Sequence, residues 1–156
     1  MKIIAGTGHR IGLLNTIERV KIKNVLKDYI LSSNPDMIIS GMALGFDQIL
    51  AEVSIDLDIP LTCAIPFKGQ ELKWNDCDIN FYNNILYKAT RTVICSKGGY
   101  SVNKLMLRNK WMIDRCTDVV ALYDGRLYGG TYNCIKYAKK CDIPIINLWN
   151  KYNDCI

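Results

Sequence analysis

The sequence has little of what metal centres, disulfide frameworks and membrane spans require. It holds one histidine and no CxxC pair among its seven cysteines, so a zinc site of the common types is not expected. The cysteine number is odd, and several cysteines lie in apolar runs such as LTCAI and TVICS, which indicates free thiols in a reducing cytosol. No apolar run approaches the roughly 20 residues that span a bilayer, and MKIIAGTG lacks a signal-peptide stretch. We therefore expect a cytoplasmic protein without a metal ion and without membrane contact.

Long runs of one charge are also missing. The net charge is +5, and the densest basic stretch, RVKIKNVLK, alternates with apolar residues at helical spacing. That pattern predicts the solvated face of an amphipathic helix rather than a nucleic-acid surface, which usually gathers its basic residues. The net positive charge still suits a small anionic ligand if a few arginine and lysine side chains lie close together in the fold.

Short apolar runs alternate with helical patterns along all 156 residues, with no linker, repeat or low-complexity segment between them. The patterns predict strands at 2–6, 36–40, 61–67, 91–96, 118–124 and 144–149, and helices at 16–31, 45–58, 75–89, 101–116 and 130–141. This order predicts one domain, residues 1–156, with an α/β three-layer Rossmann-like fold and a mostly parallel sheet. In the first helix Ile17, Val20, Val25 and Tyr29 lie near one face, and Asp76 or Asp78 is the expected cap of the third.

Glycine-rich segments follow three of the predicted strands. GTGHR follows the first strand, SGMALGFDQ the second and YDGRLYGGTYN the fifth, while PFKGQELKW follows the third. Ligands of open parallel sheets bind beyond the carboxyl ends of the strands, and glycine allows backbone N–H groups to approach an anion. None of these segments is a Walker loop or a GxGxxG fingerprint. Three of them at one sheet edge favour a phosphate-binding site over three unrelated turns.

Polar side chains cluster in the same segments. Arg108 and Asn109 are adjacent in a helix, where the planar guanidinium fork of arginine can hold phosphate oxygens and an amide can hold ribose oxygens. The predicted ligand-binding residues are Gly6, Thr7, Gly8, His9, Arg10, Ser40, Gly41, Gly45, Asp47, Trp74, Arg108, Asn109, Asp124, Gly129, Gly130, Thr131 and Asn133.

Several of these residues also have a structural interpretation, which stays open. His9 is interpreted as a ligand contact without a catalytic role, although a lone histidine after a strand can be purely structural. Asp47 is either a ribose-binding or acid–base group, or a first-turn carboxylate stabilised by the helix dipole. Trp74 stacks on a base or covers the core, and Asp124 forms a turn or contacts the ligand. Glu71 has no obvious partner in the sequence, so Asp47 and Glu71 are the candidate catalytic carboxylates.

The segments GTGHR, ISGMALGFDQ, IPFKGQELKW, LMLRNKWMIDRCTDVVALYDG and GGTYNCIKYAKK together resemble the YpsA-like branch of the SLOG superfamily. They occur in the family order and cover nearly the whole chain. The wider superfamily includes DprA, which binds single-stranded DNA, and the LOG phosphoribohydrolases, which cleave the bond between a base and a ribose phosphate. The resemblance implies a Rossmann-like fold with a nucleotide-type ligand at the glycine-rich edge. LOG enzymes carry PGGxGTxxE, whereas YGGTYNCIKYA lacks the leading proline and has Cys134 where the catalytic glutamate is expected.

These observations favour a protein that binds a phosphorylated nucleotide-derived ligand as a sensor or a sequestering protein, with no further cofactor. SLOG domains are associated with ADP-ribose-like signals in antiviral defence and often self-associate, and small members occur in phages. The resemblance therefore implies a homo-oligomer and allows a phage-encoded counter-defence role. Two alternatives stay open: a nucleotide N-glycosidase or phosphoribohydrolase, and a DprA-like binder of single-stranded nucleic acid.

Overall fold

The computed structural model describes residues 1–10 and 16–154. Six strands in this part of the chain form one sheet in the order β4-β3-β2-β1-β5-β6, and all neighbours pair in parallel. The strands are β1 (Ile3–Gly8), β2 (Met37–Ser40), β3 (Leu61–Phe67), β4 (Arg91–Ser96), β5 (Asp118–Leu122) and β6 (Ile145–Asn147). The helices are α1 (Thr16–Ser33), α2 (Phe46–Asp56), α3 (Asp76–Lys88), α4 (Val102–Ile113), α5 (Gly130–Lys140) and α6 (Trp149–Asn153).

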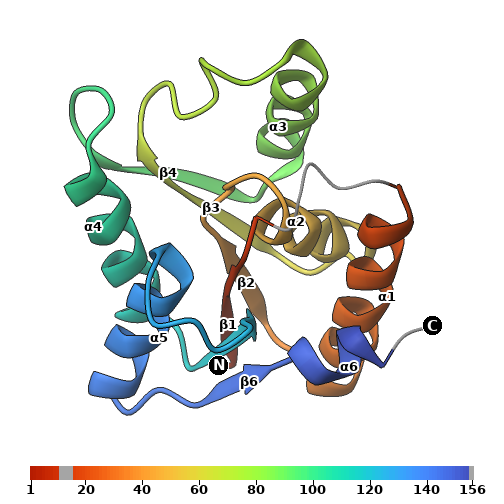
Figure 1. Ribbon diagram of the computed structural model, residues 1–156. Helices are drawn as coiled ribbons and strands as arrows, with labels where there is room; N and C mark the ends of the chain where they lie inside the picture. Colours follow the sequence, from red (N-terminus) through yellow and green to blue (C-terminus); the bar gives the residue numbers. More distant parts are fainter. Residues whose placement is uncertain (11–15, 155–156) are drawn as a thin grey trace.

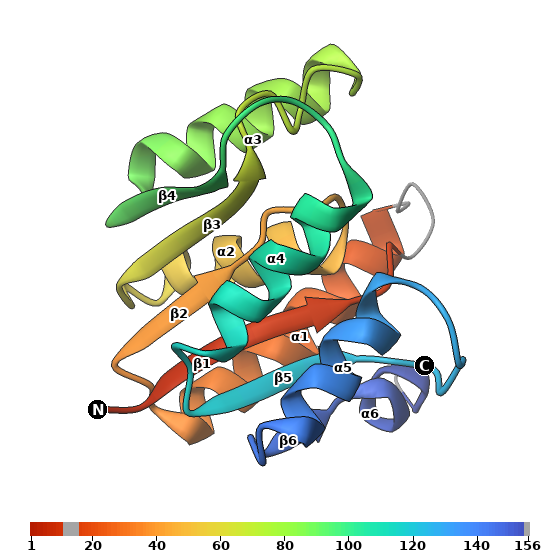
Figure 2. The same cartoon turned by 90° about the vertical axis from the view of Figure 1, so that its left-hand side faces the viewer.

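Helices cover both faces of this sheet (Figures 1 and 2). On one face α1, α2, α3 and α6 enclose a core in which Ile4 packs with Leu26 and Leu50. On the other face α4 and α5 enclose a second core, in which Ala5 packs with Met112. The consecutive residues Ile4 and Ala5 belong to different cores because side chains alternate across a strand. The three-layer Rossmann-like fold predicted from the sequence is confirmed, with a fully parallel sheet in the described chain.

The first glycine-rich segment is strand where a turn was expected. β1 continues to Gly8, which pairs with Leu122 of β5, so both Gly6 and Gly8 lie inside the sheet. A Cβ atom on Gly6 would lie 2.1 Å from Cδ2 of Leu50, and one on Gly8 would lie 2.3 Å from Cγ of Phe46. Both glycines are therefore required by the close packing of α2 on β1, which a glycine-rich sequence pattern does not distinguish from a ligand-binding turn.

The buried face of α1 agrees with the prediction in part. Val25 is buried and Tyr29 packs against the core, as predicted, whereas Ile17 and Val20 are exposed. Ile22, Leu26 and Ile30 complete the buried face. These residues face the core that α1 shares with α2.

Two element boundaries were set by asparagine side chains. Asn75 caps α3, since its side-chain oxygen accepts the N–H of Asp78 at 2.8 Å, and the two expected caps lie in the first turn instead. Near the C-terminus, Asn147 Oδ1 accepts the N–H of Trp149 at 3.1 Å. The last strand accordingly ends at Asn147, and Trp149 begins the short helix α6 instead of ending a strand.

The described cysteines form no disulfide bond. The six described cysteines are free; Cys63 and Cys134 are buried and Cys77 is exposed, while Cys155 lies outside the described residues. None of the described helices is long and apolar enough to cross a bilayer.

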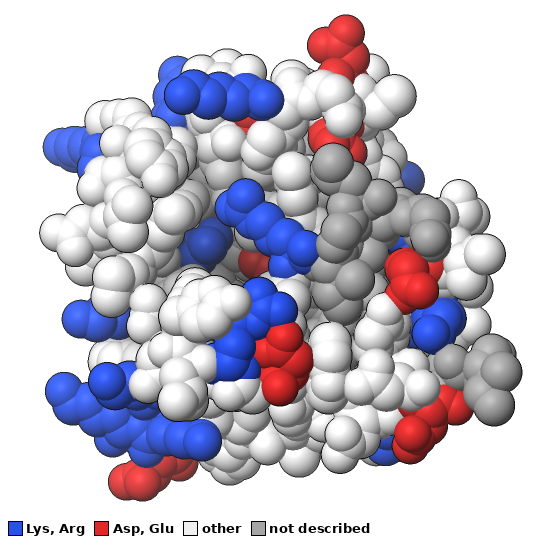
Figure 3. Space-filling model, viewed as in Figure 1, with Lys and Arg blue, Asp and Glu red and all other residues white. Residues whose placement is uncertain are grey.

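The strand order places a topological switch point between β1 and β5. From β1 the chain passes to β2 through α1, and from β5 it passes to β6 on the opposite side through α5. Connections that leave in opposite directions open a crevice at the carboxyl ends of the two strands. Figure 3 looks onto this end of the sheet and shows it hollowed, with basic and acidic side chains at the hollow.

Candidate functional site

Arg108 is the main cation of this edge. It lies in the middle of α4, which crosses the sheet on its way from β4 to β5, and only 6% of the residue is exposed. Its Nη1 donates to the carbonyl oxygen of Gly41 at 2.5 Å, and its Nε donates to Oδ1 of Asn109 at 3.0 Å. A Cβ atom on Gly41 would lie 2.6 Å from that Nη1. Glycine at position 41 therefore allows the guanidinium to lie against the β2–α2 turn.

Asp47 is the buried carboxylate of the same edge. It stands in the first turn of α2, is 8% exposed, and accepts the N–H of Ala43 at 3.3 Å. Burial raises the pKa of Asp47 to about 6, and the positive charge of Arg108 opposes this shift only in part, followed by the Ala43 N–H and the charge of Arg10. Burial lowers the pKa of Arg108, and the charge of Asp47 is the first of the interactions that oppose this. The charged form of each side chain is thus stabilised by the charge of the other.

No salt bridge joins Asp47 to Arg108 within residues 1–10 and 16–154. Arg10, whose charge also acts on both groups, is exposed and has no salt bridge in the same part of the chain. Two buried opposite charges therefore interact at a distance, and the charge of an exposed arginine acts on both.

The turn between β2 and α2 is held by its own side chains. Ser40 Oγ donates to the carbonyl oxygen of Asp47 at 2.6 Å and accepts the N–H of Met42 at 3.2 Å. Gln48 Nε2 donates to the carbonyl oxygen of Met42 at 3.3 Å. Met42 has a φ of 60° and Gly45 a φ of 90°, both in the left-handed region. Ser40 therefore shapes the turn that carries Asp47, and its hydroxyl is already engaged.

The N-terminus of α5 forms the opposite wall. Gly129 precedes the helix with a φ of 96° and provides no side-chain cap, and a Cβ atom on Gly129 or Gly130 would meet nothing within 4 Å. Thr131 is 8% exposed, and no hydrogen bond of its hydroxyl is found in the described chain. One turn later, Cys134 interacts with the Thr7 side chain and with the charges of Asp47 and Arg108. This open helix start therefore belongs to the same neighbourhood, and its free N–H groups favour an anion.

His9 and Asp124 form a separate cluster that joins the ends of β1 and β5. His9 Nε2 accepts the backbone N–H of Asp124 at 2.9 Å and also lies 3.0 Å from Oδ1 of that residue. Burial lowers the pKa of His9 despite the nearby Asp124 carboxylate, so we assign the neutral ring with its proton on Nδ1. Asp124 is bound in turn by Arg126, with Nε 3.0 Å from each carboxylate oxygen. These contacts hold the start of the β5–α5 loop against the end of β1. The side chains of His9 and Asp124 both have protein partners.

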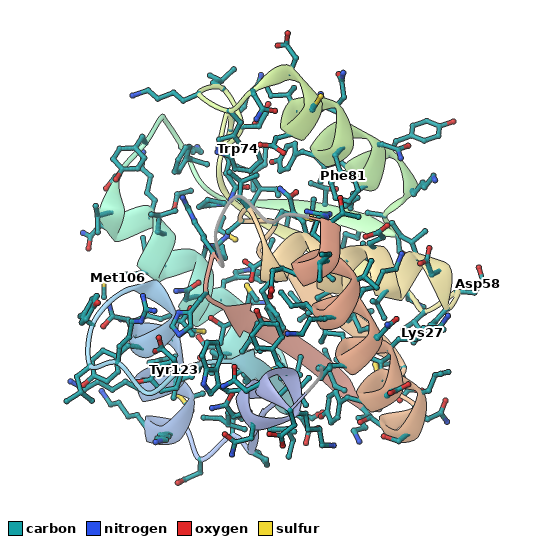
Figure 4. All side chains as sticks on the ribbon, turned by 45° about the vertical axis from the view of Figure 1, so that its right-hand side comes forward. Lys27, Asp58, Trp74, Phe81, Met106 and Tyr123 are labelled. Carbon is teal, nitrogen blue, oxygen red and sulfur yellow. The ribbon has the colours of Figure 1, made fainter. Side chains whose placement is uncertain are left out.

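The remaining predicted residues lie further out. Trp74 packs edge-on against Tyr82 at 5.3 Å between ring centroids and contacts the core beside α3 (Figure 4). Glu71 is half-buried in the same β3–α3 loop, and Asn133 is exposed on α5. The structure thus gives Trp74 a packing role and does not bring Glu71 into contact with Asp47 or Arg108 through any salt bridge or hydrogen bond of the described chain.

Sequence reasoning missed two groups of the site. Gln70 Nε2 donates to the carbonyl oxygen of Gly41 at 3.3 Å, and Arg126 holds Asp124. Each stands in a polar loop, where a glutamine or arginine is usually solvated. No sequence pattern identifies either residue. The partner of Gln70 is a backbone carbonyl far away in the chain, and the partner of Arg126 is a side chain two residues earlier in the same loop.

Comparison with known proteins places the chain among bacterial proteins of the same size. It is 32% identical over 150 residues to the uncharacterized SPβ prophage-derived protein YoqJ of Bacillus subtilis, with 86% of each chain covered. It is 28% identical over 155 residues to a UPF0398 protein of Bacillus thuringiensis, covering 90% of this chain and 84% of the relative.

Solved structures share the fold at low sequence identity. DNA processing protein A (DprA) of Streptococcus pneumoniae superposes with a TM-score of 0.69 at 14% identity; the match covers 93% of this chain but only 49% of DprA. The molybdenum cofactor binding protein of Rippkaea orientalis superposes with a TM-score of 0.61 at 14% identity, covering 99% of this chain and 86% of that protein.

The family model described as the YspA SLOG family (YpsA) matches residues 13–145, which is most of the chain. The predicted resemblance to the YpsA-like branch is thereby confirmed, and the chain belongs to the YpsA family of SLOG proteins.

Proposed function

We propose that this protein binds a phosphorylated nucleotide-derived ligand at the carboxyl edge of the sheet, as a sensor or a sequestering protein. One observation carries the proposal: Asp47 and Arg108 are both buried at the carboxyl edge of the sheet, beside the β2–α2 turn, and no salt bridge joins them in the described chain. A phosphate accepts hydrogen bonds from Arg108 and Arg10, and a ribose hydroxyl donates one to Asp47. The open start of α5, from Gly129 to Thr131, supplies further N–H donors for the phosphate.

The comparisons support a ligand of this class. The neighbour from Rippkaea orientalis binds the molybdenum cofactor, and DprA of Helicobacter pylori binds single-stranded DNA, according to the names of their structures. A small ligand suits the crevice better than a polymer, because the two buried charges lie beneath its surface. The prophage origin of YoqJ supports a phage-encoded protein that sequesters a nucleotide signal of the host, for which ADP-ribose-like and cyclic nucleotides are the candidates.

The test is a binding panel with a check of ligand fate. Purified protein is incubated with nucleotides, NAD, ADP-ribose and cyclic ADP-ribose isomers, and thermal shift reports binding. Chromatography of the ligand released by heat then reports whether it is intact. Stabilisation by one ligand that is recovered intact supports the proposal. If no member raises the Tm, the proposed ligand class is wrong.

A hydrolase is the second candidate, and the raised pKa of Asp47, about 6, favours it. A carboxylic acid with such a pKa can transfer a proton near neutrality, as cleavage of an N-glycosidic bond requires. Release of free base or ribose phosphate in the same panel, abolished by Asp47→Asn while binding survives, would establish this activity. Glu71→Gln tests the other candidate carboxylate, which is half-buried in the β3–α3 loop.

Single-stranded nucleic acid is the third candidate. Basic side chains that are scattered in the sequence come together on α4 and α5, where Lys110 and Lys136 lie over tyrosine rings and Lys139 and Lys140 end α5. Binding there would weaken steeply with added salt. Fluorescence anisotropy with a labelled oligothymidine at two salt concentrations decides this candidate, and the absence of binding at low salt removes it.

Self-association is also proposed. α4 exposes apolar side chains at Val102, Met106 and Leu107, and Figure 4 shows Met106 on the outer side of that helix. Light scattering coupled to size-exclusion chromatography measures the assembly. A mass above that of one chain that falls on Met106→Lys substitution supports an interface at α4.

A further inference from the structure

The carbonyl oxygen of Gly41 accepts two side-chain donors from different segments of the chain. One is Nη1 of Arg108 at 2.5 Å, from α4, and the other is Nε2 of Gln70 at 3.3 Å, from the β3–α3 loop. A carbonyl has two lone pairs, so both donors can bind at once. The orientation of this one carbonyl therefore depends on both side chains, and the position of Arg108 depends on the carbonyl.

The amide of Gln70 has only one orientation available. Its Oε1 accepts the hydroxyl of Tyr82 at 3.3 Å, and Tyr82 is 2% exposed. Burial raises the pKa of Tyr82, so the phenol stays protonated and acts as a donor. A flipped amide would place its NH₂ group against that donor and its oxygen against the Gly41 carbonyl. Tyr82 thus ensures that Gln70 presents an N–H group to Gly41.

The loop that carries Gln70 is itself held in place. Gly69 has a φ of 91°, and a Cβ atom there would lie 2.7 Å from Cδ1 of Leu72, so the turn before Gln70 tolerates glycine alone without strain. The N–H of Leu72 donates to the carbonyl oxygen of Gly69 at 3.2 Å. The loop therefore delivers Gln70 to the site in one conformation.

Arg108 is left with one free side of its guanidinium. Nε is bound by Asn109 and Nη1 by Gly41, whereas Nη2 has no hydrogen bond to any described residue. Two fixed contacts on a planar group determine where its remaining donors point. Any rotation of the Gly41 carbonyl would release one of these contacts and change the direction of the free donors.

We propose that Gln70 is a positioning residue, which together with Tyr82 sets the Gly41 carbonyl and thereby orients Arg108 toward the phosphate of the ligand. The inference rests on the proposed function and adds to it a residue that does not touch the ligand. It makes the β3–α3 loop part of the binding apparatus through a chain of three hydrogen bonds: Tyr82 to Gln70, Gln70 to Gly41, and Arg108 to Gly41.

The same chain contains a matched control. Gln48 is a buried glutamine, whereas Gln70 is half-buried, and Gln48 Nε2 donates to a carbonyl of the same turn, that of Met42, at the same distance of 3.3 Å. That carbonyl does not bind Arg108. Replacing either glutamine by methionine keeps the volume and removes its bond to the turn carbonyl; Gln70→Met also removes the bond from Tyr82, which Tyr82→Phe removes alone. A purely structural role predicts that all three substitutions lower stability and leave Kd unchanged.

The experiment measures affinity and stability for the wild-type protein, Gln70→Met, Gln48→Met and Tyr82→Phe. Isothermal titration with inorganic phosphate and with ADP-ribose gives Kd, and urea unfolding gives stability. We expect Gln70→Met to weaken binding of either probe about tenfold, the loss of roughly one hydrogen bond. Gln48→Met lowers stability but changes Kd less than twofold, and Tyr82→Phe weakens binding to a smaller extent than Gln70→Met.

A double-mutant cycle with Arg108→Lys completes the test. If Gln70 acts through Arg108, Gln70→Met costs little further affinity once the guanidinium is gone. Equal affinity of Gln70→Met and wild type, or the full tenfold loss in the Arg108→Lys background, overturns the inference and leaves the proposed function standing. A wild-type protein that binds neither phosphate nor any member of the nucleotide panel overturns the proposed function, and the inference with it.

Discussion

The Asp47 carboxylate and the Arg108 guanidinium are each more than nine-tenths buried and feel each other's charge, yet no salt bridge joins them in the described chain. Burying two charges without direct contact costs stability, and proteins keep such arrangements where the charges serve a ligand. The predictions below test this arrangement and the packing that supports it.

Asp47 should make stability fall as pH rises from about 4 to 6. Its pKa in the folded protein, about 6, lies above the ordinary value of 3.8, so the folded state holds the proton more tightly than the unfolded state. Unfolding then releases a proton in this window, and stability decreases by at most ~3 kcal/mol before levelling off above pH 6. Urea unfolding across this range should show the slope for wild type and not for Asp47→Asn. An unchanged slope in the variant would contradict the assignment.

Gly41→Ala should destabilise the protein and disturb Arg108. The new Cβ atom would lie 2.6 Å from Nη1 of Arg108, and the guanidinium must move to accommodate it. We expect a loss of about 1–3 kcal/mol in urea unfolding, together with weaker phosphate binding. Gly99→Ala is the control, because a Cβ atom at Gly99 meets nothing within 4 Å. Equal stability of the two variants would show that the close contact is not limiting.

Gly8→Ala should be among the most harmful substitutions in the sheet. Its Cβ atom would lie 2.3 Å from Cγ of Phe46, and α2 cannot retreat without opening the core. We expect a loss of about 2–3 kcal/mol or more, measured as a fall in Tm and in the urea midpoint. Phe46→Leu in the same chain should recover part of the loss by making room. Absence of any recovery would point to a cause other than this contact.

His9 should make stability fall as pH decreases, which is opposite in sign to the effect predicted for Asp47. Burial lowers its pKa in the folded state below the ordinary value of 6.5, so the folded protein prefers the neutral ring. Stability is therefore complete above the ordinary pKa and is lost as pH falls below it toward the lowered value. The non-titrating variant His9→Gln, whose side-chain oxygen can still accept the Asp124 N–H, should remove this contribution. Comparing urea unfolding of Asp47→Asn with that of the double variant isolates it, and identical pH profiles would contradict the prediction.

Much of the fold was predictable because the spacing of apolar residues along the chain indicates which segments form buried strands and helices. The run LTCAIPF is buried along all of β3, as expected of a central strand with helices on both faces. Arg108, Asn109 and Asp47 were also singled out from their positions after strands or in an adjoining helix. The structure joins Arg108 to Asn109 and lets its charge act on Asp47, and their role in binding stays a prediction. In α1 the predicted face was right for Val25 and wrong for Ile17 and Val20, and only contact with the core decided which apolar residues are buried.

What the sequence by itself determined is the alternation of strands and helices, hence a parallel sheet with its strand ends gathered on one side. What only the tertiary structure decided is the role of individual residues. Gly6 and Gly8 serve the packing of α2, His9 braces a loop, and Gln70 reaches Gly41 across the turn. The physical reason is distance along the chain: burial patterns are set by neighbours three or four residues away, whereas these contacts join segments whose approach exists only after the sheet has assembled.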